Sequence, residues 1–407
     1  MTSLTAECCI SGGGPAGLML GYLLARRGID VIVLEKHADF LRDFRGDTVH
    51  PSTLELFYEL GLLDGLLERR HQTTDRVSMM ISGDRLQIAD FRRLSTRCKF
   101  IAMMPQWDFL DYLADEARAY PNFRLLMSTE SRSLIEENGS VAGLRAVSEE
   151  GEIEIRSSLV VAADGRASQL RDLSGLEVQD FGAPIDVFWM RLARKPDDST
   201  ESIAHISSSG FLVLINRNDY WQCAMPIRKG HAEEIRAQGI GEFRSRITRI
   251  APSLADATQG LRDWDDVKLL TVQVNRLKTW WREGLLFIGD AAHAMSPIGG
   301  VGINLAIQDA VAAGRILGPA LRAGNVTTDL LASIQKRREW PTRATQRAQI
   351  FAQDRILVPV LGADEEIRAP FFLRLLNAVP ALRGLPARAI GLGVRPEHWH
   401  GEDGAEY

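Results

Sequence analysis

Residues 7–17 read Glu7-Cys-Cys-Ile-Ser-Gly-Gly-Gly-Pro-Ala-Gly17, and they decide the fold. A short apolar strand enters the glycines, and a leucine-rich helix with small residues follows them as far as Gly28. The next segment, Asp30-Val-Ile-Val-Leu-Glu35, is a second apolar strand. A strand, a glycine loop, a helix and a strand within about 30 residues have the length of one βαβ crossover. The sequence therefore predicts an α/β protein with neighbouring parallel strands.

The glycine loop has the spacing of a dinucleotide-binding turn, with Glu35 at the end of the following strand. Glycines let the backbone approach a pyrophosphate, which the N–H groups and dipole of a helix N-terminus attract. Glu35 would accept hydrogen bonds from ribose hydroxyls and repel a 2′-phosphate, so the ADP part of FAD or NAD fits this loop and NADP does not. A tight turn beside a solvated acid is the structural alternative. The residues expected to contact the cofactor are Gly12, Gly14, Pro15, Ala16, Gly17, Glu35 and Lys36.

Two missing motifs narrow the class of protein. The later segment Gly299-Gly-Val-Gly302 lacks the dinucleotide spacing and a following acid, so we expect no second dinucleotide-binding domain. The four cysteines form no Cys-x-x-Cys pair, which argues against a disulfide reductase or a zinc ribbon. We therefore expect no metal site.

Composition excludes further classes. The 407 residues carry 48 basic and 53 acidic side chains, a net charge of −5, so nucleic acid is not an expected partner. The longest apolar runs fall far short of the roughly 20 residues that span a membrane. The first seven residues, MTSLTAE, do not resemble a secretory signal. We expect a cytoplasmic protein without a membrane partner, either a monomer or a homodimer.

The middle of the chain has a different pattern. Residues 211–215 and 220–227 read as two strands joined around Asn216-Arg-Asn-Asp219, which predicts a hairpin in a separate antiparallel sheet. Ser52-Thr-Leu-Glu55 has the capping-box spacing that opens a helix. The predicted units are a cofactor domain from residues 1–75, 95–175 and 277–350, an inserted substrate domain from residues 76–94 and 176–276, and C-terminal helices with a polar tail over residues 351–407.

Three segments together resemble one family. They are the glycine loop with Glu35, the stretch Ala163-Asp-Gly-Arg-Ala-Ser-Gln-Leu-Arg171, and the stretch from Gly289-Asp-Ala-Ala-His293 to Asn304. In this order they resemble the single-component FAD-dependent aromatic hydroxylases, the p-hydroxybenzoate hydroxylase-like group of flavoprotein monooxygenases. The resemblance implies a Rossmann-like FAD-binding domain with an inserted antiparallel-sheet substrate domain and C-terminal helices.

The resemblance also implies roles for particular residues. Asp290 would bind the ribityl chain of FAD, although a helix cap is the alternative. Asp164 would contact FAD and support NAD(P)H binding with Arg171, although an Asp–Arg pair that ties down a turn explains Arg171 nearly as well. Arg45 would pair with the pyrophosphate and Gln106 would touch the FAD chain, with a surface ion pair and a capping role as alternatives. The residues implied to line the flavin ring are Pro297, Gly299, Gly302, Ile303 and Asn304.

The implied reaction is an oxygenation. FAD, bound non-covalently and reduced by NADPH or NADH, would react with O2 to give a C4a-hydroperoxide that hydroxylates a phenolic or polyketide-like aromatic molecule. No side chain is expected to act as a nucleophile, and no residue is assigned as the base that deprotonates a phenol. His293 is expected to be a packing and hydrogen-bonding residue, and Cys223 and His205 are interpreted as structural. Baeyer–Villiger, epoxidising or antibiotic-modifying chemistry, or flavin binding without turnover, are the alternatives.

Overall fold

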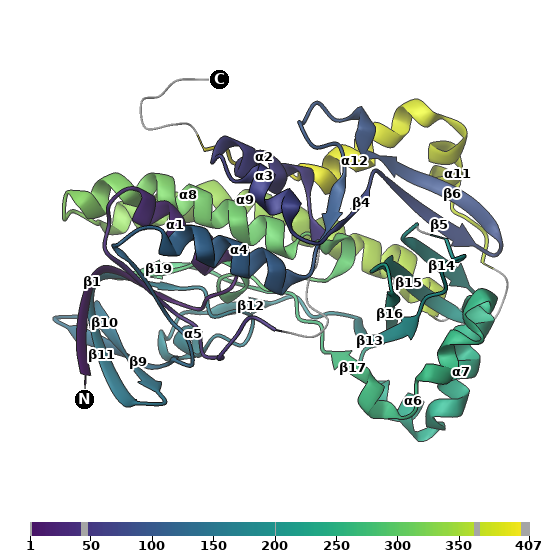
Figure 1. Cartoon of the computed structure of the whole chain (residues 1–407), viewed down its shortest axis with the longest axis horizontal. Helices are drawn as coiled ribbons and strands as arrows, with labels where there is room; N and C mark the ends of the chain where they lie inside the picture. Colours follow the sequence, from purple (N-terminus) through teal and green to yellow (C-terminus); the bar gives the residue numbers. More distant parts are fainter. Residues whose placement is uncertain (1, 42–47, 200, 362–366, 400–407) are drawn as a thin grey trace.

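The computed structural model describes residues 2–41, 48–199, 201–361 and 367–399. Two large β-sheets lie side by side, with the long helices above the first and the C-terminal helices near the second (Figure 1). The predicted α/β fold is confirmed. Within these ranges, no helix is both long and apolar enough to cross a membrane.

The first sheet has a parallel core. Its strands are β1 (Thr2–Ser11), β2 (Val31–Leu34), β8 (Phe123–Leu126), β9 (Glu130–Glu137), β10 (Ser140–Ser148), β11 (Gly151–Ala162), β19 (Trp281–Arg282) and β20 (Leu285–Phe287). The order β20-β11-β1-β2-β8 is parallel throughout, while β19, β10 and β9 add antiparallel edges. All four residues of β2 are buried, as expected of a parallel strand covered on both faces.

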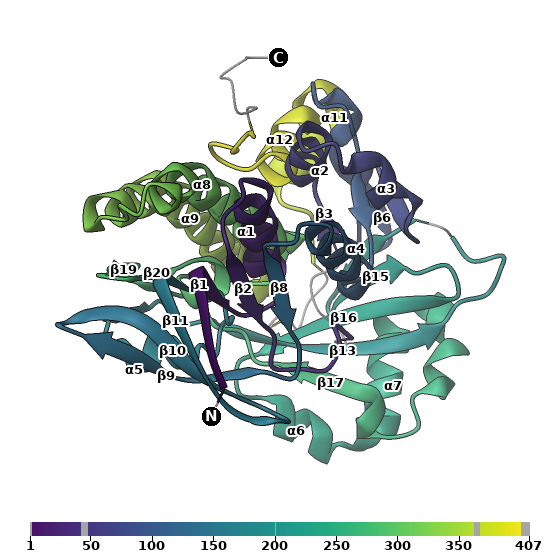
Figure 2. The ribbon, with the colours of Figure 1, turned by 60° about the vertical axis from the view of Figure 1, so that its left-hand side comes forward.

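Helices cover one face of this sheet, as Figure 2 shows. They are α1 (Pro15–Arg26), α4 (Gln106–Arg118), α8 (Gly302–Arg322) and α9 (Thr328–Ala352). Because neighbouring strand residues point to opposite faces, Val31 and Val33 pack with these helices, while Ile32 packs with Trp280 on the other side. The predicted βαβ unit is confirmed, and Gly28, at φ +78°, follows the end of α1.

The second sheet is mostly antiparallel and has the order β17-β13-β16-β15-β14-β5-β6. Its strands are β5 (Arg76–Ile81), β6 (Asp84–Asp90), β13 (Ile185–Ala193), β14 (Ile203–Ser207), β15 (Gly210–Asn216), β16 (Tyr220–Arg228) and β17 (Val267–Leu270). Strands β15 and β16 form the predicted hairpin. One face packs on α6 (Ala232–Ala237) and α7 (Gly239–Ile250), and the other on α10 (Val358–Leu361) and α11 (Phe371–Ala378).

The remaining elements are short. They are the strands β3 (Thr48–Val49), β4 (Gln72–Thr74), β7 (Ile101–Met103), β12 (Val178–Asp180) and β18 (Asn275–Leu277), and the helices α2 (Pro51–Glu59), α3 (Leu63–Glu68), α5 (Gln169–Leu173) and α12 (Gly384–Gly391). Single turns of 3-10 helix span residues 91–93, 252–254, 257–260, 264–266, 289–291, 298–300 and 380–383, and one π-helical turn spans residues 353–357.

The predicted capping box is wrong. Helix α2 begins at Pro51, one residue before the expected cap Ser52, and the N-cap is His50, which makes no side-chain capping bond. Proline suits the first helical position because its missing N–H would have no partner there and its φ is already helical. Proline thus sets the start of this helix, and Ser52 lies buried inside its first turn.

Candidate active site

Four strand ends form one row at the carboxyl edge of the parallel sheet. Ser11 pairs with Leu34 on one side and with Ala162 on the other, and Ala162 pairs with Phe287. The segments that carry the glycine loop, Glu35, Asp164 and Asp290 leave the sheet directly after this row of strand ends. Ligands of open α/β sheets bind at this edge.

Two of the three motif glycines are required by the protein's own packing. A Cβ on Gly17 would lie 1.9 Å from the carbonyl oxygen of Gly12, and a Cβ on Gly12 would lie 2.4 Å from that of Ala163. Gly14 differs, since a Cβ there would meet nothing within 4 Å and its φ of −79° suits any residue. The space in front of Gly14, at the N-cap of α1, is open.

Glu35 is fixed against the glycine loop. Its Oε2 accepts a hydrogen bond from the backbone N–H of Gly13 at 3.2 Å, and its Oε1 accepts one from His37 N–H at 3.1 Å. The carboxylate is half-buried, whereas Lys36 is exposed. Each carboxylate oxygen can accept more than one hydrogen bond, so Glu35 keeps capacity for ribose hydroxyls.

An ion pair joins the second and third motifs. Arg166 Nη2 lies 3.3 Å from Asp290 Oδ2, although the two residues are 124 positions apart. Asp164 accepts a weak bond from Leu170 N–H at 3.4 Å through Oδ2, and burial raises the pKa of its carboxyl. Two buried atoms here, Asp164 Oδ1 and Arg166 Nη1, have no hydrogen-bond partner among the described residues. Arg166 was not predicted to be a site residue, although it lies within the quoted motif.

Arg171 is engaged within the protein. It is 8% exposed, donates to the carbonyl of Arg166 at 2.7 Å, and lies 3.4 Å from Asn275 Oδ1. These contacts tie the turn after β11 to β18, which is close to the structural alternative for this residue. The alternative expected an Asp–Arg pair, but the hydrogen-bond partners of Arg171 are the backbone carbonyl of Arg166 and the side-chain amide of Asn275.

The third motif forms a glycine turn in front of α8. Gly299 and Gly300 have φ values of +78° and +63°, and Thr48 Oγ1 donates to the carbonyl of Gly300 at 2.8 Å. Asn304 Oδ1 accepts bonds from His50 N–H at 2.8 Å and Thr53 Oγ1 at 2.7 Å. The Asn304 side chain therefore holds α2 against α8.

The remaining predicted residues are Gln106, Arg45 and those around the glycine turn. Gln106 is the first residue of α4 and is half-buried. Arg45 lies outside the described residues. Pro297 and Gly302 flank the glycine turn, and Ile303 is 8% exposed in the first turn of α8.

His293, Cys223 and His205 lie in packed or partly buried positions. His293 Nε2 lies 2.6 Å from Asp309 Oδ2 with both side chains buried, so its interpretation as a packing and hydrogen-bonding residue is confirmed. Cys223 packs in the apolar cluster beneath α7. His205 alternates with Ala204 and Ile206 along β14 and so points away from the face that those two residues share with Ile298.

The glycine turn meets the second sheet through an apolar cluster. Ile298, just before Gly299, packs against the buried apolar cluster on one face of that sheet, and Trp189, Val213 and Leu270 pack against the same cluster. The hairpin of the same sheet carries a buried polar pair, in which Arg217 Nε donates to Gln222 Oε1 at 3.0 Å. Sequence periodicity alone gave no signal for this pair, because an arginine in a turn usually faces solvent.

Comparison with known proteins identifies the group to which this arrangement belongs. Residues 5–348 match the family described as FAD binding domain. A protein of Streptomyces rimosus named 6-methylpretetramide 4-monooxygenase is 33% identical over 386 residues, which cover 94% of this chain and 91% of that protein. The chain belongs to the FAD-dependent aromatic hydroxylases. A rifampicin monooxygenase of Streptomyces venezuelae is 28% identical to this hydroxylase over 75% of the chain and 62% of its own length.

Solved structures agree on the fold of the hydroxylase. The p-nitrophenol 4-monooxygenase PnpA of Pseudomonas putida superposes with a TM-score of 0.76 at 18% identity, with 96% of each chain covered. The anhydrotetracycline hydroxylase OxyS of Streptomyces rimosus gives a TM-score of 0.75 at 23% identity, with 97% of this chain and 77% of that chain covered. At such identities these likenesses concern the fold alone.

Proposed function

We propose that the hydroxylase binds FAD non-covalently along the carboxyl edge of its first sheet. The observation that carries this proposal is the row of strand ends Ser11, Leu34, Ala162 and Phe287, because it gathers the segments that the family uses for its cofactor. Two further observations support a fit between this edge of the sheet and FAD. The space before Gly14 is open, and buried polar atoms nearby lack partners that phosphates and hydroxyls would supply.

Each part of the edge has a role in this proposal. The N-terminus of α1 would hold the pyrophosphate with Arg45 and Gln106 nearby, and Glu35 with Lys36 would hold the adenosine ribose. Asp290, paired with Arg166, would bind the ribityl chain beside Asp164. The residues proposed to line the ring are Pro297, Gly299, Gly302, Ile303 and the backbone of Asn304. Residues 1–75, 95–175 and 277–350 would then be the FAD-binding unit, residues 76–94 and 176–276 the substrate unit, and residues 351–407 the C-terminal helices and tail.

The chemistry of oxygen transfer belongs to the cofactor, and the chain supplies orientation and charge. When bound and reduced by NAD(P)H, FAD would activate O2 for attack on an aromatic carbon. The N-terminus of α8, which begins at Gly302, would stabilise negative charge on the reduced ring. The apolar cluster of Ile298, Trp189, Val213 and Leu270 would exclude water and hold a flat substrate.

We further propose a phenolic or polyketide-like substrate. The support is the relative named 6-methylpretetramide 4-monooxygenase, which aligns with nearly the whole chain. The buried Arg217–Gln222 pair would offer hydrogen bonds to substrate oxygens on the same sheet. The test is NADPH oxidation in air by the FAD-loaded protein, with phenols, polycyclic aromatics and 6-methylpretetramide, followed by mass and NMR analysis of products.

One compound is expected to accelerate NADPH oxidation and to gain one oxygen atom on an aromatic carbon. Hydrogen peroxide as the sole product with every compound would contradict hydroxylation. Oxygen inserted between two carbons, or added across a double bond, would instead assign Baeyer–Villiger or epoxidising chemistry on this scaffold.

A further inference from the structure

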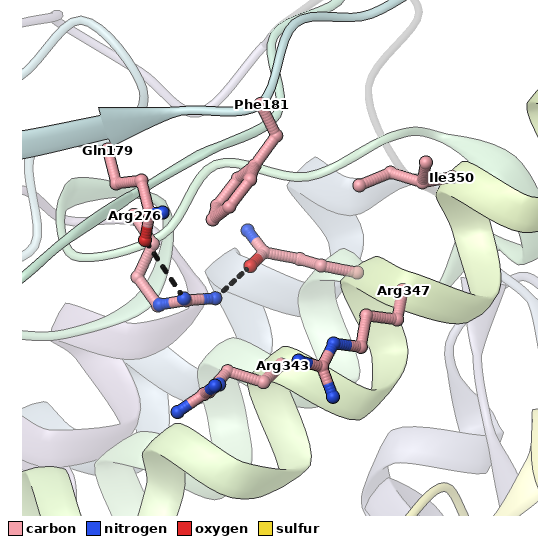
Figure 3. A pocket seen from close by; sticks show the side chains of 7 residues that line it. Gln179, Phe181, Arg276, Arg343, Arg347 and Ile350 are labelled. Carbon is pink, nitrogen blue, oxygen red and sulfur yellow. Dashed lines mark hydrogen bonds between the residues drawn. The ribbon is translucent and has the colours of Figure 1, made fainter.

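A hollow of about 210 Å³ opens beside α9. Side chains from the segment around β12, from β18 and from α9 point into it (Figure 3). It is lined by Gln179, Phe181, Arg276, Arg343, Gln346, Arg347 and Ile350. Three of the seven lining residues are arginines and none is acidic, so the hollow is strongly positive.

Arg276 is the fixed centre of this hollow. It is 7% exposed, and it donates through Nη1 to Gln346 Oε1 at 2.8 Å and through Nη2 to Gln179 Oε1 at 3.4 Å. Its partners are neutral amides, so its charge is oriented without being neutralised. Burial lowers the pKa of Arg276, the charge of Glu339 raises it in part, and the charges of Arg343 and Arg347 lower it further. A ligand with negative charge would relieve this repulsion.

One acid, Glu339, partly offsets the charge of Arg276 and Arg343. Glu339 lies 4.0 Å from Arg276 Nε and 3.7 Å from Arg343 Nη1, at the outer limit of an ion pair. Arg347 is exposed and makes no hydrogen bond or ion pair within the described part of the chain. The Arg347 guanidinium is therefore available to an anion that enters the hollow, and the charges of Arg276 and Arg343 lie beside it.

Aromatic rings accompany the positive charge. The guanidinium of Arg276 stacks 5.0 Å from the ring centre of Phe181. A neighbouring hollow of about 400 Å³ shares Arg343 and is also lined by Lys278, Lys336, Glu339 and the ring of Trp340, which is 59% exposed. Phosphate-binding arginines beside an exposed aromatic ring match the two chemical parts of a nucleotide.

Helix α9 connects this hollow to the glycine turn proposed to line the flavin. Gln346 Nε2 donates to the carbonyls of Asn275 and Ala294, both at 2.9 Å. One turn further along, Gln349 Nε2 donates to the carbonyls of Ser296 and Ile298, both at 2.9 Å. A molecule that lay along α9 from Arg343 to Ile350 would end next to the segment that leads into Gly299.

We propose that this arginine hollow binds a phosphate group of the nicotinamide dinucleotide, and that the dinucleotide lies along α9 with its base against Trp340. A volume of about 210 Å³ is below the roughly 300–1,000 Å³ of pockets that enclose a whole small-molecule ligand, so the hollow takes only a phosphate and its sugar. The inference rests on the proposed use of NAD(P)H. The phosphate is either the diphosphate bridge or the 2′-phosphate, and the test separates these two sources.

The test compares Arg347→Gln with Arg388→Gln in the FAD-loaded protein. Arg388 is an exposed arginine of α12 outside both hollows, so it controls for the loss of one surface charge. Calorimetric titration with ADP, 2′,5′-ADP and inorganic phosphate measures binding without turnover. Rapid mixing with NADPH or NADH in the absence of air gives the dissociation constant and the limiting rate of flavin reduction.

Arg347→Gln is expected to weaken dinucleotide binding roughly tenfold while the limiting reduction rate changes less than about twofold, because a charge-assisted bond to phosphate is lost. Weakening of NADH and ADP as well as NADPH would assign the diphosphate bridge. Weakening of NADPH and 2′,5′-ADP alone would assign the 2′-phosphate.

Three results would overturn the inference. They are an unchanged dissociation constant in Arg347→Gln, an equal loss in Arg388→Gln, and inorganic phosphate that binds the wild type as tightly as ADP. Because binding is measured directly, failure to hydroxylate any aromatic compound would count against the proposed function and leave this site standing. If the Arg347→Gln variant hydroxylates normally and binds NADPH with an unchanged dissociation constant, the proposed function would stand and this phosphate site would be wrong.

Discussion

Asp309 Oδ2 lies 2.6 Å from His293 Nε2, and neither side chain is more than 1% exposed. The same oxygen accepts the backbone N–H of Gly289 at 3.1 Å, directly before Asp290, while Oδ1 accepts from Arg338 Nε at 2.9 Å. One carboxylate on α8 therefore fixes the turn that presents Asp290. This connects the buried charge network to the proposed cofactor edge.

Replacement of Asp309 by asparagine is expected to lower the free energy of unfolding by about 3–5 kcal/mol, because it leaves the Arg338 charge and the Gly289 N–H poorly matched in the core. Urea denaturation checks this. Asp354→Asn, at an exposed position in the π-helical turn, is the control and is expected to change stability by less than about 0.5 kcal/mol. A loss below 1 kcal/mol in Asp309→Asn would show that the network contributes little.

Lowering the pH should destabilise the wild type because the Asp309 carboxylate becomes protonated. Burial on its own would raise the pKa of Asp309, but the charges and hydrogen bonds of His293 and Arg338 outweigh burial and hold that pKa below 3.8. The contribution of Asp309 is therefore complete above the unfolded pKa near 4 and is lost as pH falls through the folded value. Stability measured between pH 5 and about pH 3 should fall more steeply for wild type than for Asp309→Asn. Parallel curves would contradict this linkage.

The C-terminal segment should be essential for stability through Glu397. Its buried carboxylate lies within 3.3 Å of Arg338 and 3.0 Å of Arg315, and Arg337 Nη2 lies at 2.7 Å. Glu397→Gln is expected to cost about 3–5 kcal/mol in unfolding free energy, because the fully buried Arg338 loses one of its two acids. Glu149→Gln, at an exposed position after β10, is the matched control. Equal unfolding midpoints for the two variants would refute the importance of this contact.

The two glycines of the first motif should separate folding from cofactor binding. Gly17→Ala is expected to destabilise the protein without FAD by about 3 kcal/mol or more, since its Cβ would overlap the Gly12 carbonyl. Gly14→Ala should cost at most about 1 kcal/mol, mainly from the helix cap, yet weaken FAD binding at least about tenfold by filling the open space. Thermal unfolding without FAD and fluorescence titration with FAD measure the two effects. Unchanged FAD affinity in Gly14→Ala would place the pyrophosphate elsewhere.

Local patterns explain why so much of the fold was predictable. The strands around Gly12 and Glu35 are short apolar runs whose parallel pairing follows from the helix between them. Once those strands are parallel, their carboxyl ends must meet at one edge of the sheet. The hairpin around residues 216–219 was equally local, because its turn residues lie between two apolar runs.

Long-range partners could not be predicted in this way. The Arg166–Asp290 pair spans 124 residues, and the bond between Asn304 and Thr53 spans 251. Nothing in the sequence near Asn304 indicates that its side chain would be used by α2 and not by a cofactor. The helix start at Pro51 was missed for a different reason, since Ser52 and Glu55 have the spacing of a capping box but Pro51 already fits the first helical position.

Transfer of an oxygen atom from O2 to an aromatic carbon is the central claim, and incubation under isotopically labelled O2 tests it most directly. The FAD-loaded protein is mixed with NADPH and the compound that best accelerates its oxidation, and the product is analysed by mass spectrometry. The account predicts one labelled oxygen atom on the aromatic ring. A product whose added oxygen comes from water, or a flavin that neither NADPH nor NADH reduces with any compound, would contradict it.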